Sequence, residues 1–239
     1  RRTWGGLRAM SLRSIVIFLG IGCVVAAHWY AFYTSIKISN VSVAVSCLGL
    51  GSIFAAIIEP VLMRRPHERA ELFLGVLAVP GVVLIVGGVP LQMRLGIVIG
   101  VVAALLSAIF TTLNKRFATN NDPFAITCIE MAAGVVVLGI PAILSGLTIP
   151  TPMDSVWLLV LAIACTLLPF VMWIQSLRYV TAFSTLLMLN LEPVYAILLA
   201  AVLFKEYEDL TLLFYIGTGI VLLTVLLQPH VRQFAHSTK

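Results

Sequence analysis

Residues 181–204 read TAFSTLLMLNLEPVYAILLAAVLF, an apolar run with one carboxyl group and one proline near its middle. The run is about as long as the roughly 20 residues that a helix needs to cross the hydrocarbon core of a bilayer. An ionisable side chain at membrane depth is costly, so Glu192 is expected to face the interior of a helix bundle and to have a function. Pro193 lacks an N–H group and leaves the Leu189 carbonyl without its helical partner. One helical turn therefore offers a carboxyl, the Asn190 amide and a free carbonyl.

The composition of the whole chain also indicates a membrane protein. The 239 residues are 61% hydrophobic and only 10% charged, and the mean hydropathy is +1.09, far outside the range of soluble domains. Long unbroken apolar runs exclude a β-barrel, whose strands alternate polar and apolar residues. The sequence predicts an all-α polytopic membrane protein. Its net charge of +5 lies in the loops and gives no reason to expect nucleic-acid binding.

Eight apolar stretches are long enough to be membrane helices. The connections between them are short and polar, which leaves no room for a soluble domain. We expect the eight spans at about residues 12–34, 39–63, 70–88, 92–114, 124–146, 155–177, 181–204 and 210–228.

Lysine and arginine residues predict the orientation of these spans. Three of the 15, Lys37, Arg94 and Lys205, lie on one side. The other 12 lie on the opposite side, at Arg1, Arg2, Arg8, Arg13, Arg64, Arg65, Arg69, Lys115, Arg116, Arg178, Arg232 and Lys239. Cytoplasmic loops carry the excess of basic residues. Both ends of this chain are therefore predicted to be cytoplasmic.

The two halves of the chain show an internal repeat. An offset of 141 residues lays Ser35-Ile36-Lys37 over Ser176-Leu177-Arg178, each read as a short link between two spans. The aligned spans are separated by an odd number of crossings, so the two copies have opposite orientations. Inverted repeats are typical of secondary transporters, whose substrate site lies near the bilayer midplane between the halves.

Three motifs carry a family resemblance. They are FYTSIKISNVSVA at residues 32–44, IIEPVL at 57–62, and NLEPVYA at 190–196 followed by LFKE at 203–206. The first is similar to the link between the third and fourth helices of the EamA family, in the drug/metabolite transporter superfamily. The second resembles the end of that family's fourth helix, and the third resembles its ninth. The resemblance extends over the whole chain.

The resemblance implies ten helices in two inverted five-helix repeats, in the inner (cytoplasmic) membrane of a bacterium. Residues 1–91 would be helices three to five of the first repeat, and residues 92–239 would be the second repeat. The first two helices, roughly 60 residues at ~20 per span plus links, would precede residue 1, unless an eight-helix chain is a genuine variant. The resemblance further implies efflux or exchange of small metabolites by alternating access.

Polar and aromatic residues inside the spans are the candidates for substrate binding. Tyr195 shares a helix face with Glu192, and the aromatic side chains could line a pocket for a flat or apolar substrate. Aromatic residues also line membrane interfaces and fill cores, which is their commoner use. The candidate substrate-binding residues are Glu192, Asn190, Tyr195, His28, Trp29, Tyr33, Trp173 and Gln175.

Glu130, Glu192 and His28 are the candidates for a gate or for proton coupling. Glu130 lies about two turns from the cytoplasmic edge and could reach a wet vestibule. Histidine titrates near neutrality, although a buried neutral His28 bonded to a backbone carbonyl is an equal alternative. Glu192 could likewise be a protonated carboxyl that only fixes helix packing. Glu59 we interpret mainly as a helix-end charge paired with Arg64 or Arg65.

Several kinds of chemistry have no motif in this sequence. There is no GxSxG serine motif, no phosphate-binding loop and no complete metal-binding HExxH motif, so we expect neither an enzyme nor a cofactor or metal site. The four cysteines, at positions 23, 47, 128 and 165, lie in apolar runs and are expected to be buried thiols.

Two functional hypotheses remain. The first is a secondary transporter that exports or exchanges a small metabolite or drug, with proton coupling as an option. The second is a membrane-embedded binding or scaffold protein that does not transport. The expected partners are a small-molecule substrate and the lipid bilayer, and the chain is expected to be a monomer or homodimer.

Overall fold

The computed structural model describes residues 10–67, 80–81, 83–146, 150–182, 185–186, 192–205 and 210–237. All regular structure within these ranges is helical. Five of the expected spans are confirmed as helices long and apolar enough to cross a membrane, namely Leu12–Ile38, Val41–Met63, Leu91–Phe117, Pro123–Leu144 and Pro152–Ser176. Each of the other three expected spans has a helical part that the structure describes. These parts are residues 80–81 and 83–87 of the span 70–88, residues 192–204 of the span 181–204, and residues 212–228 of the span 210–228. The all-α polytopic fold is therefore confirmed.

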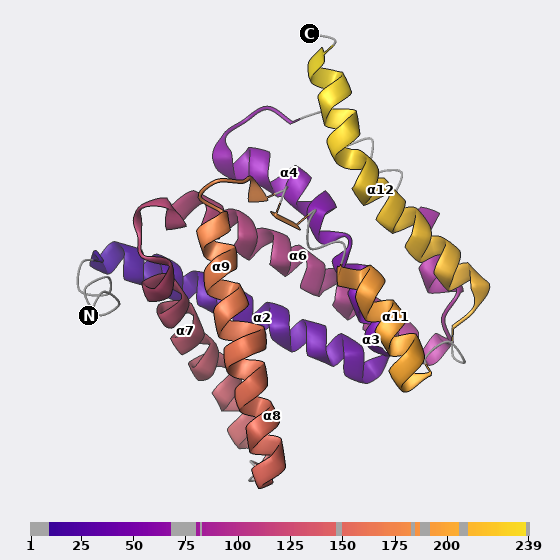
Figure 1. Ribbon diagram of the computed structural model, residues 1–239, viewed down its shortest axis with the longest axis horizontal. Helices are drawn as coiled ribbons and strands as arrows, with labels where there is room; N and C mark the ends of the chain where they lie inside the picture. The colour runs from indigo at the N-terminus through magenta and orange to yellow at the C-terminus, as the bar shows by residue number, and fades with distance from the viewer. Residues whose placement is uncertain are drawn as a thin grey trace. The chain divides into compact units, whose positions relative to one another are not determined.

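The helices follow one another along the chain with short connections. Two single 3-10 turns, Leu91–Met93 and Ala118–Asn120, flank one of the long helices. The α-helices are α2 (Leu12–Ile38), α3 (Val41–Leu48), α4 (Gly51–Met63), α6 (Arg94–Phe117), α7 (Pro123–Leu144), α8 (Pro152–Ala162), α9 (Leu168–Ser176), α11 (Glu192–Phe204) and α12 (Leu212–Ser237). Figure 1 shows α8 and α9 as one continuous rod, joined by a π-helical turn at Ile163–Leu167.

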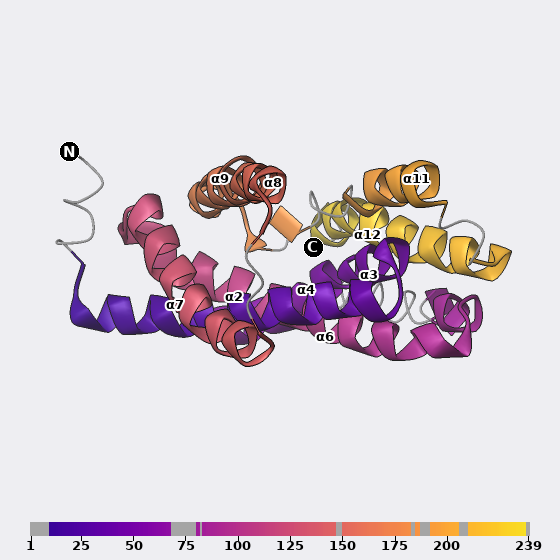
Figure 2. The same cartoon turned by 90° about the horizontal axis from the view of Figure 1, so that it is seen from below.

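The chain divides into two compact units, with the boundaries inside α2 and α6. The first unit comprises Arg1–Ala27 and Leu113–Thr181, and in it α7 packs against α9 (Figure 1). The second comprises His28–Thr112 and Ala182–Lys239, and in it α11 packs against α3 (Figure 2). These units differ from the predicted halves 1–91 and 92–239. A repeat boundary follows sequence similarity whereas a compact unit follows contacts, so the repeat boundary stays a prediction.

Small residues bring the helices of the second unit close together. A Cβ atom added at Gly96 would lie 2.6 Å from Ser39 Oγ, and one at Gly100 would lie 2.9 Å from Cys47 Cβ. Ser35 Oγ donates to the Gly96 carbonyl at 2.7 Å. The close helix contact that the spacing Gly96-x-x-x-Gly100 permits is therefore present. Around it lies an apolar core that includes Ile97 and, from α12, Phe214.

Two links differ from the sequence prediction. Ser35-Ile36-Lys37, interpreted as a link, is the last turn of α2, because α2 ends only at Ile38 and Asn40 caps the following helix by accepting from the Val43 N–H at 2.9 Å. The span expected at 39–63 is interrupted between α3 and α4, where the Leu50 N–H bonds the Cys47 carbonyl in a tighter turn.

The cysteines also depart from the prediction. Cys47 is buried, but Cys23, Cys128 and Cys165 are exposed, and all four thiols are free. The expectation of burial is wrong for three of them because it came from soluble proteins. In a membrane helix an apolar side chain can face lipid, so apolar character does not indicate which side of the helix faces the bundle.

The end of α4 offers a test of backbone strain. Arg64 adopts φ 54° and ψ 44°, a left-handed conformation in which its N–H reaches the Pro60 and Val61 carbonyls. This conformation costs a non-glycine residue roughly 1–2 kcal/mol. We expect Arg64→Gly to raise the free energy of unfolding by about 1 kcal/mol, measured by thermal unfolding in detergent.

Arg64→Ala is the matched control, because it removes the same charge but keeps the Cβ atom that causes the strain. Equal stabilities of the glycine and alanine variants would contradict a strained left-handed cap.

Candidate functional site

Glu130 is placed by a well-defined helix start. The Asp122 carboxylate caps α7 by accepting from the N–H groups of Phe124 and Ala125 at 2.9 and 3.1 Å, and Pro123 occupies the first helical position. Two turns later Glu130 is fully buried, with 0% of its surface exposed. Its side chain is therefore enclosed by protein in this structure, and its role as a gate or proton-coupling group stays a prediction.

Asn114 on α6 is the polar partner of Glu130, within the same unit. Its side chain is also 0% exposed, and its Nδ2 lies 3.4 Å from Glu130 Oε2, longer than the ~2.9 Å usual for such a bond. Glu130 Oε1 and Asn114 Oδ1 are both buried, and neither has a hydrogen-bond partner in the described part of the chain. Two acceptor oxygens thus lie in the protein interior without a donor from any described residue.

Helix α2 packs closely against the α7 backbone at Glu130. A Cβ atom added at Gly22 would lie 2.6 Å from the backbone oxygen of Glu130, 2.7 Å from its Cα and 2.8 Å from Ala133 Cβ. The backbones of α2 and α7 are therefore almost in contact at Glu130. No side chain larger than hydrogen fits at position 22 without moving the two helices apart.

Burial of the Glu130 carboxyl and the Asn114 amide lowers the stability of the folded protein. Across the described ranges the one ion pair joins Glu59 and Arg65, so no basic group lies within 4.0 Å of the Glu130 carboxyl. An unsatisfied buried polar atom costs about 1–3 kcal/mol, and an unpaired buried charge costs more. Polar groups kept at such a cost inside a membrane helix are functional candidates. Carboxyl oxygens without a donor can take up and release a proton.

His28 is buried in the second unit and is held by a backbone bond. Its Nδ1 lies 2.8 Å from the Ala103 carbonyl of α6. Its ring is parallel to Phe32, with centroids 6.2 Å apart, and meets the edge of Phe110 at 5.3 Å. The bond to a backbone carbonyl that one of the two alternatives for His28 requires is present, and a role of His28 in proton coupling stays a prediction.

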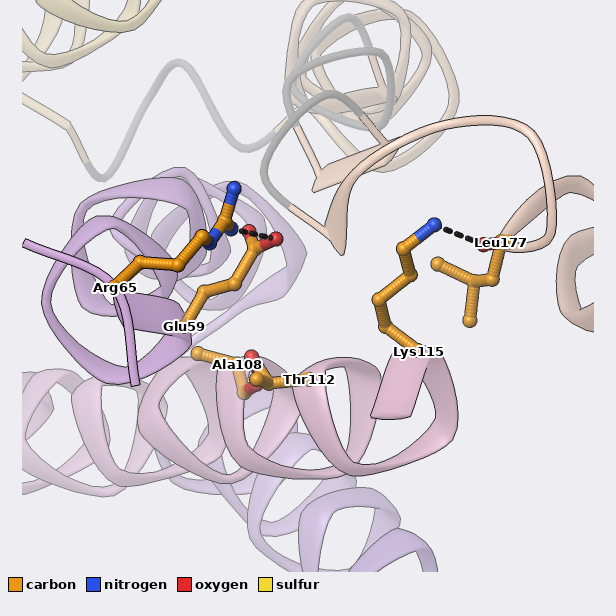
Figure 3. Close-up of polar contacts among 6 residues, drawn as sticks. All are labelled: Glu59, Arg65, Ala108, Thr112, Lys115 and Leu177. Carbon is orange, nitrogen blue, oxygen red and sulfur yellow. Dashed lines mark hydrogen bonds and ion pairs between the residues drawn. The ribbon is translucent and has the colours of Figure 1, made fainter. Parts of the chain in front are cut away.

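Glu59 forms an ion pair at the end of α4, as predicted. Arg65 Nη2 donates to Glu59 Oε1 at 2.6 Å (Figure 3). The Glu59 side chain is buried, whereas Arg65 is about half exposed. The left-handed turn at Arg64 reverses the chain and brings Arg65 back over the helix end.

Two basic side chains of the first unit bond backbone carbonyls. Lys115 Nζ donates to the Leu177 carbonyl at 2.6 Å (Figure 3), which places a cation at the C-terminal end of α9, where helix carbonyls lack partners. Arg178 Nη2 donates to the Asn121 carbonyl. These bonds fasten the end of α9 to the end of α6 and the link that follows it.

The remaining candidates fall in both units. Trp29, Tyr33, Glu192 and Tyr195 belong to the second, where Trp29 is half-buried and the other three are exposed. Trp173, half-buried and 5.2 Å from the Phe170 ring, and the exposed Gln175 belong to the first. Asn190 lies outside the described residues. The role of all these residues in substrate binding stays a prediction.

Asn114 and Gly22 were not recognised from the sequence. Asn114 stands at the last position of the expected span 92–114, where an amide looks like an interfacial residue. Gly22 is one of many glycines in apolar runs. The available signal was that Asn114 precedes the basic residues Lys115 and Arg116. If these mark the end of the span, the helix continues to Phe117 and Asn114 lies about one turn inside it.

Comparisons with known proteins identify the family. A model of the EamA-like transporter family matches residues 94–228, more than half of the chain. The chain belongs to this family. It is a multi-pass membrane protein, and its family is one of transporters, which are generally not enzymes.

Individual relatives agree with the family. The chain is 26% identical over 220 residues to an uncharacterized transporter of Bacillus subtilis, covering 89% of this chain and 68% of the relative. It is 25% identical over 214 residues to an uncharacterized transporter of Archaeoglobus fulgidus, covering 86% and 70%. A crystal structure superposes with a TM-score of 0.66 at 13% identity, covering 95% of this chain and 80% of the other, a likeness of fold alone.

Proposed function

We propose that this EamA-like protein is a secondary transporter that exports or exchanges a small metabolite or drug by alternating access, with Glu130 as its proton-coupling site. Family membership supports transport. The observation that carries the coupling is the fully buried carboxyl of Glu130, whose Oε1 has no donor among the described residues. Such a group inside a transporter can exchange a proton as the helices around it rearrange.

Two inverted repeats, within residues 1–91 and 92–239, are part of this proposal. The offset of 141 that aligns the spans also relates Arg64 to Lys205. These two are the non-glycine residues with positive φ among those described, and both have φ 54°. Each is a basic residue that follows a helix, α4 or α11. The family match to residues 94–228 lies inside the proposed second repeat.

We further propose that the substrate is neutral or zwitterionic. Few charges and many aromatic groups among the candidates support this. Glu192 is the main candidate to bind a polar group of the substrate, with Asn190, Tyr195, His28, Trp29, Tyr33, Trp173 and Gln175 lining its path. The excess of basic residues on one side supports cytoplasmic ends in a bacterial inner membrane.

Transport can be tested without knowing the substrate. Liposomes containing the purified protein are loaded with a bacterial metabolite extract, and mass spectrometry follows the loss of each solute over time. We expect one solute, or a few related ones, to leave faster than from protein-free liposomes. Equal loss of every solute with and without protein would contradict transport and favour the membrane-embedded scaffold.

A further inference from the structure

We propose that Asn114 is a positioning residue for Glu130, whose amide holds the carboxyl in both of its protonation states. The inference rests on the proposed role of Glu130 as the proton-coupling site. Asn114 is not a proton carrier itself. It acts through the Glu130 side chain, which it meets from the neighbouring helix.

The geometry leaves Asn114 as the polar group available to Glu130. Both side chains are completely buried, one from α6 and one from α7. Helix α2 approaches the Glu130 backbone at Gly22, which has no side chain to offer to the carboxyl. Asn114 Nδ2 is the hydrogen-bond partner of the Glu130 carboxyl in the described chain.

No charged group of the surrounding helices takes that place. Helix α9, which packs against α7, has no titratable side chain. The titratable residues of α7 are Cys128 and Glu130. The first-unit part of α2 carries Arg13 and Cys23, and the end of α6 carries Lys115 and Arg116. None of these is within ion-pair distance of Glu130, and Lys115 donates to the Leu177 carbonyl.

An amide suits a carboxyl that gains and loses a proton. Its NH2 group can donate to a carboxylate, and its oxygen can accept from the O–H of a carboxylic acid. Rotation of the Asn114 amide by half a turn exchanges the positions of its NH2 group and its oxygen. A proton transferred from hydronium to Glu130 leaves one water molecule and forms an O–H group. That O–H group supplies the donor that Asn114 Oδ1 lacks in the structure.

The tight packing favours a proton over larger occupants. Both side chains of the pair are 0% exposed, so an organic ammonium group could not reach the carboxyl unless the helices moved apart. Hard metal cations take about six to eight oxygen ligands, whereas the pair offers two open oxygens. A proton needs one acceptor and one partner, which this pair provides.

Infrared difference spectroscopy of the reconstituted full chain tests the inference with the proton as the probe. Spectra at acid and alkaline pH show the C=O stretch of each carboxylic acid that titrates, and Glu130→Gln identifies the band of Glu130. In Asn114→Leu we expect this band to move in frequency and its pH midpoint to be displaced by at least one pH unit, a tenfold change in proton affinity. Asn114→Thr retains a hydroxyl that can donate and accept, and we expect its midpoint to stay closer to that of the wild type.

Thr127→Val is the matched control. Thr127 lies one turn before Glu130 and is buried. Its hydroxyl donates to the Pro123 carbonyl of its own helix and not to Glu130. We expect its band and midpoint to equal those of the wild type.

The possible results separate the two proposals. The positioning role would be overturned if the band and the pH midpoint of Asn114→Leu equalled those of the wild type. It would also be overturned if the midpoint of Asn114→Thr moved as far as that of Asn114→Leu. Either result would leave proton coupling intact. If Asn114→Leu does not fold, Asn114→Ala, which also lacks a donor and an acceptor at this position, takes its place with the same expected and contradicting results. If no titrating band disappears in Glu130→Gln, the proposed proton site itself fails.

Discussion

Glu130→Gln is expected to abolish proton-driven accumulation of the transported solute while the protein still folds and still exchanges the solute downhill. Glutamine has nearly the same shape and can hydrogen-bond to Asn114, but it cannot release a proton. For each coupled proton, one unit of pH gradient can sustain up to about tenfold accumulation. We expect this ratio to fall to one in the variant, measured in proteoliposomes with an imposed pH gradient.

Asp122→Asn is the control for this experiment. It removes a carboxylate from the same helix, and asparagine is also a good N-cap. Accumulation should therefore survive in Asp122→Asn. A Glu130→Gln protein that still accumulates solute against its gradient would show that the coupling group lies elsewhere.

Gly217→Ala is expected to destabilise the protein strongly. A Cβ atom at Gly217 would lie 2.5 Å from the Gly81 carbonyl oxygen and 2.7 Å from the Ile85 amide nitrogen. Both are backbone atoms, so α12 and the helical residues 80–81 and 83–87 would have to separate. Overpacking of a core costs about 1–3 kcal/mol, and here we expect the upper end of that range, measured by thermal unfolding in detergent.

Gly219→Ala separates this contact from the general effect of glycine in a helix. Gly219 is on the same helix, is exposed, and has no atom within 4 Å of its added Cβ. Alanine there should stabilise α12 by up to about 1 kcal/mol. Similar shifts for the two variants would contradict the close approach of the two backbones.

Hydropathy and charge predicted the class of fold because the position of a membrane helix is decided mainly by the cost of placing polar groups in lipid. That cost is summed over about 20 residues, so single exceptions do not obscure it. The break between α3 and α4 and the π turn between α8 and α9 were not predicted. Each depends on a local hydrogen-bond choice worth little compared with burial of a whole span.

The candidate site was predicted only in part, because the sequence shows which polar residues are in the membrane but not which of them meet. Glu130 was recognised from its depth alone. Its partners, Asn114 and Gly22, come from two other helices, and their importance depends on distances that no periodicity contains. For His28 the sequence left two alternatives, and the structure adds the bond to the Ala103 carbonyl that one of them requires.

The repeat is an intermediate case. The offset was found from two short motifs, one of which, Ser35-Ile36-Lys37, is the end of a helix and not a link. The same offset nevertheless relates the left-handed residues Arg64 and Lys205, which the sequence did not single out. A backbone conformation that is uncommon for residues other than glycine is stronger support for a repeat than similarity between apolar runs.

The most direct test of proton-coupled transport is whether the wild-type protein, alone in liposomes, moves a solute uphill when only a pH gradient is supplied. The solute is first identified by its loss from extract-loaded proteoliposomes. It is then placed at equal concentration on both sides, and its distribution is followed after the pH jump. Proton coupling predicts accumulation on one side, which collapses when a protonophore is added. A solute that stays at equal concentration under the gradient, while still equilibrating rapidly through the protein, would contradict proton-coupled transport.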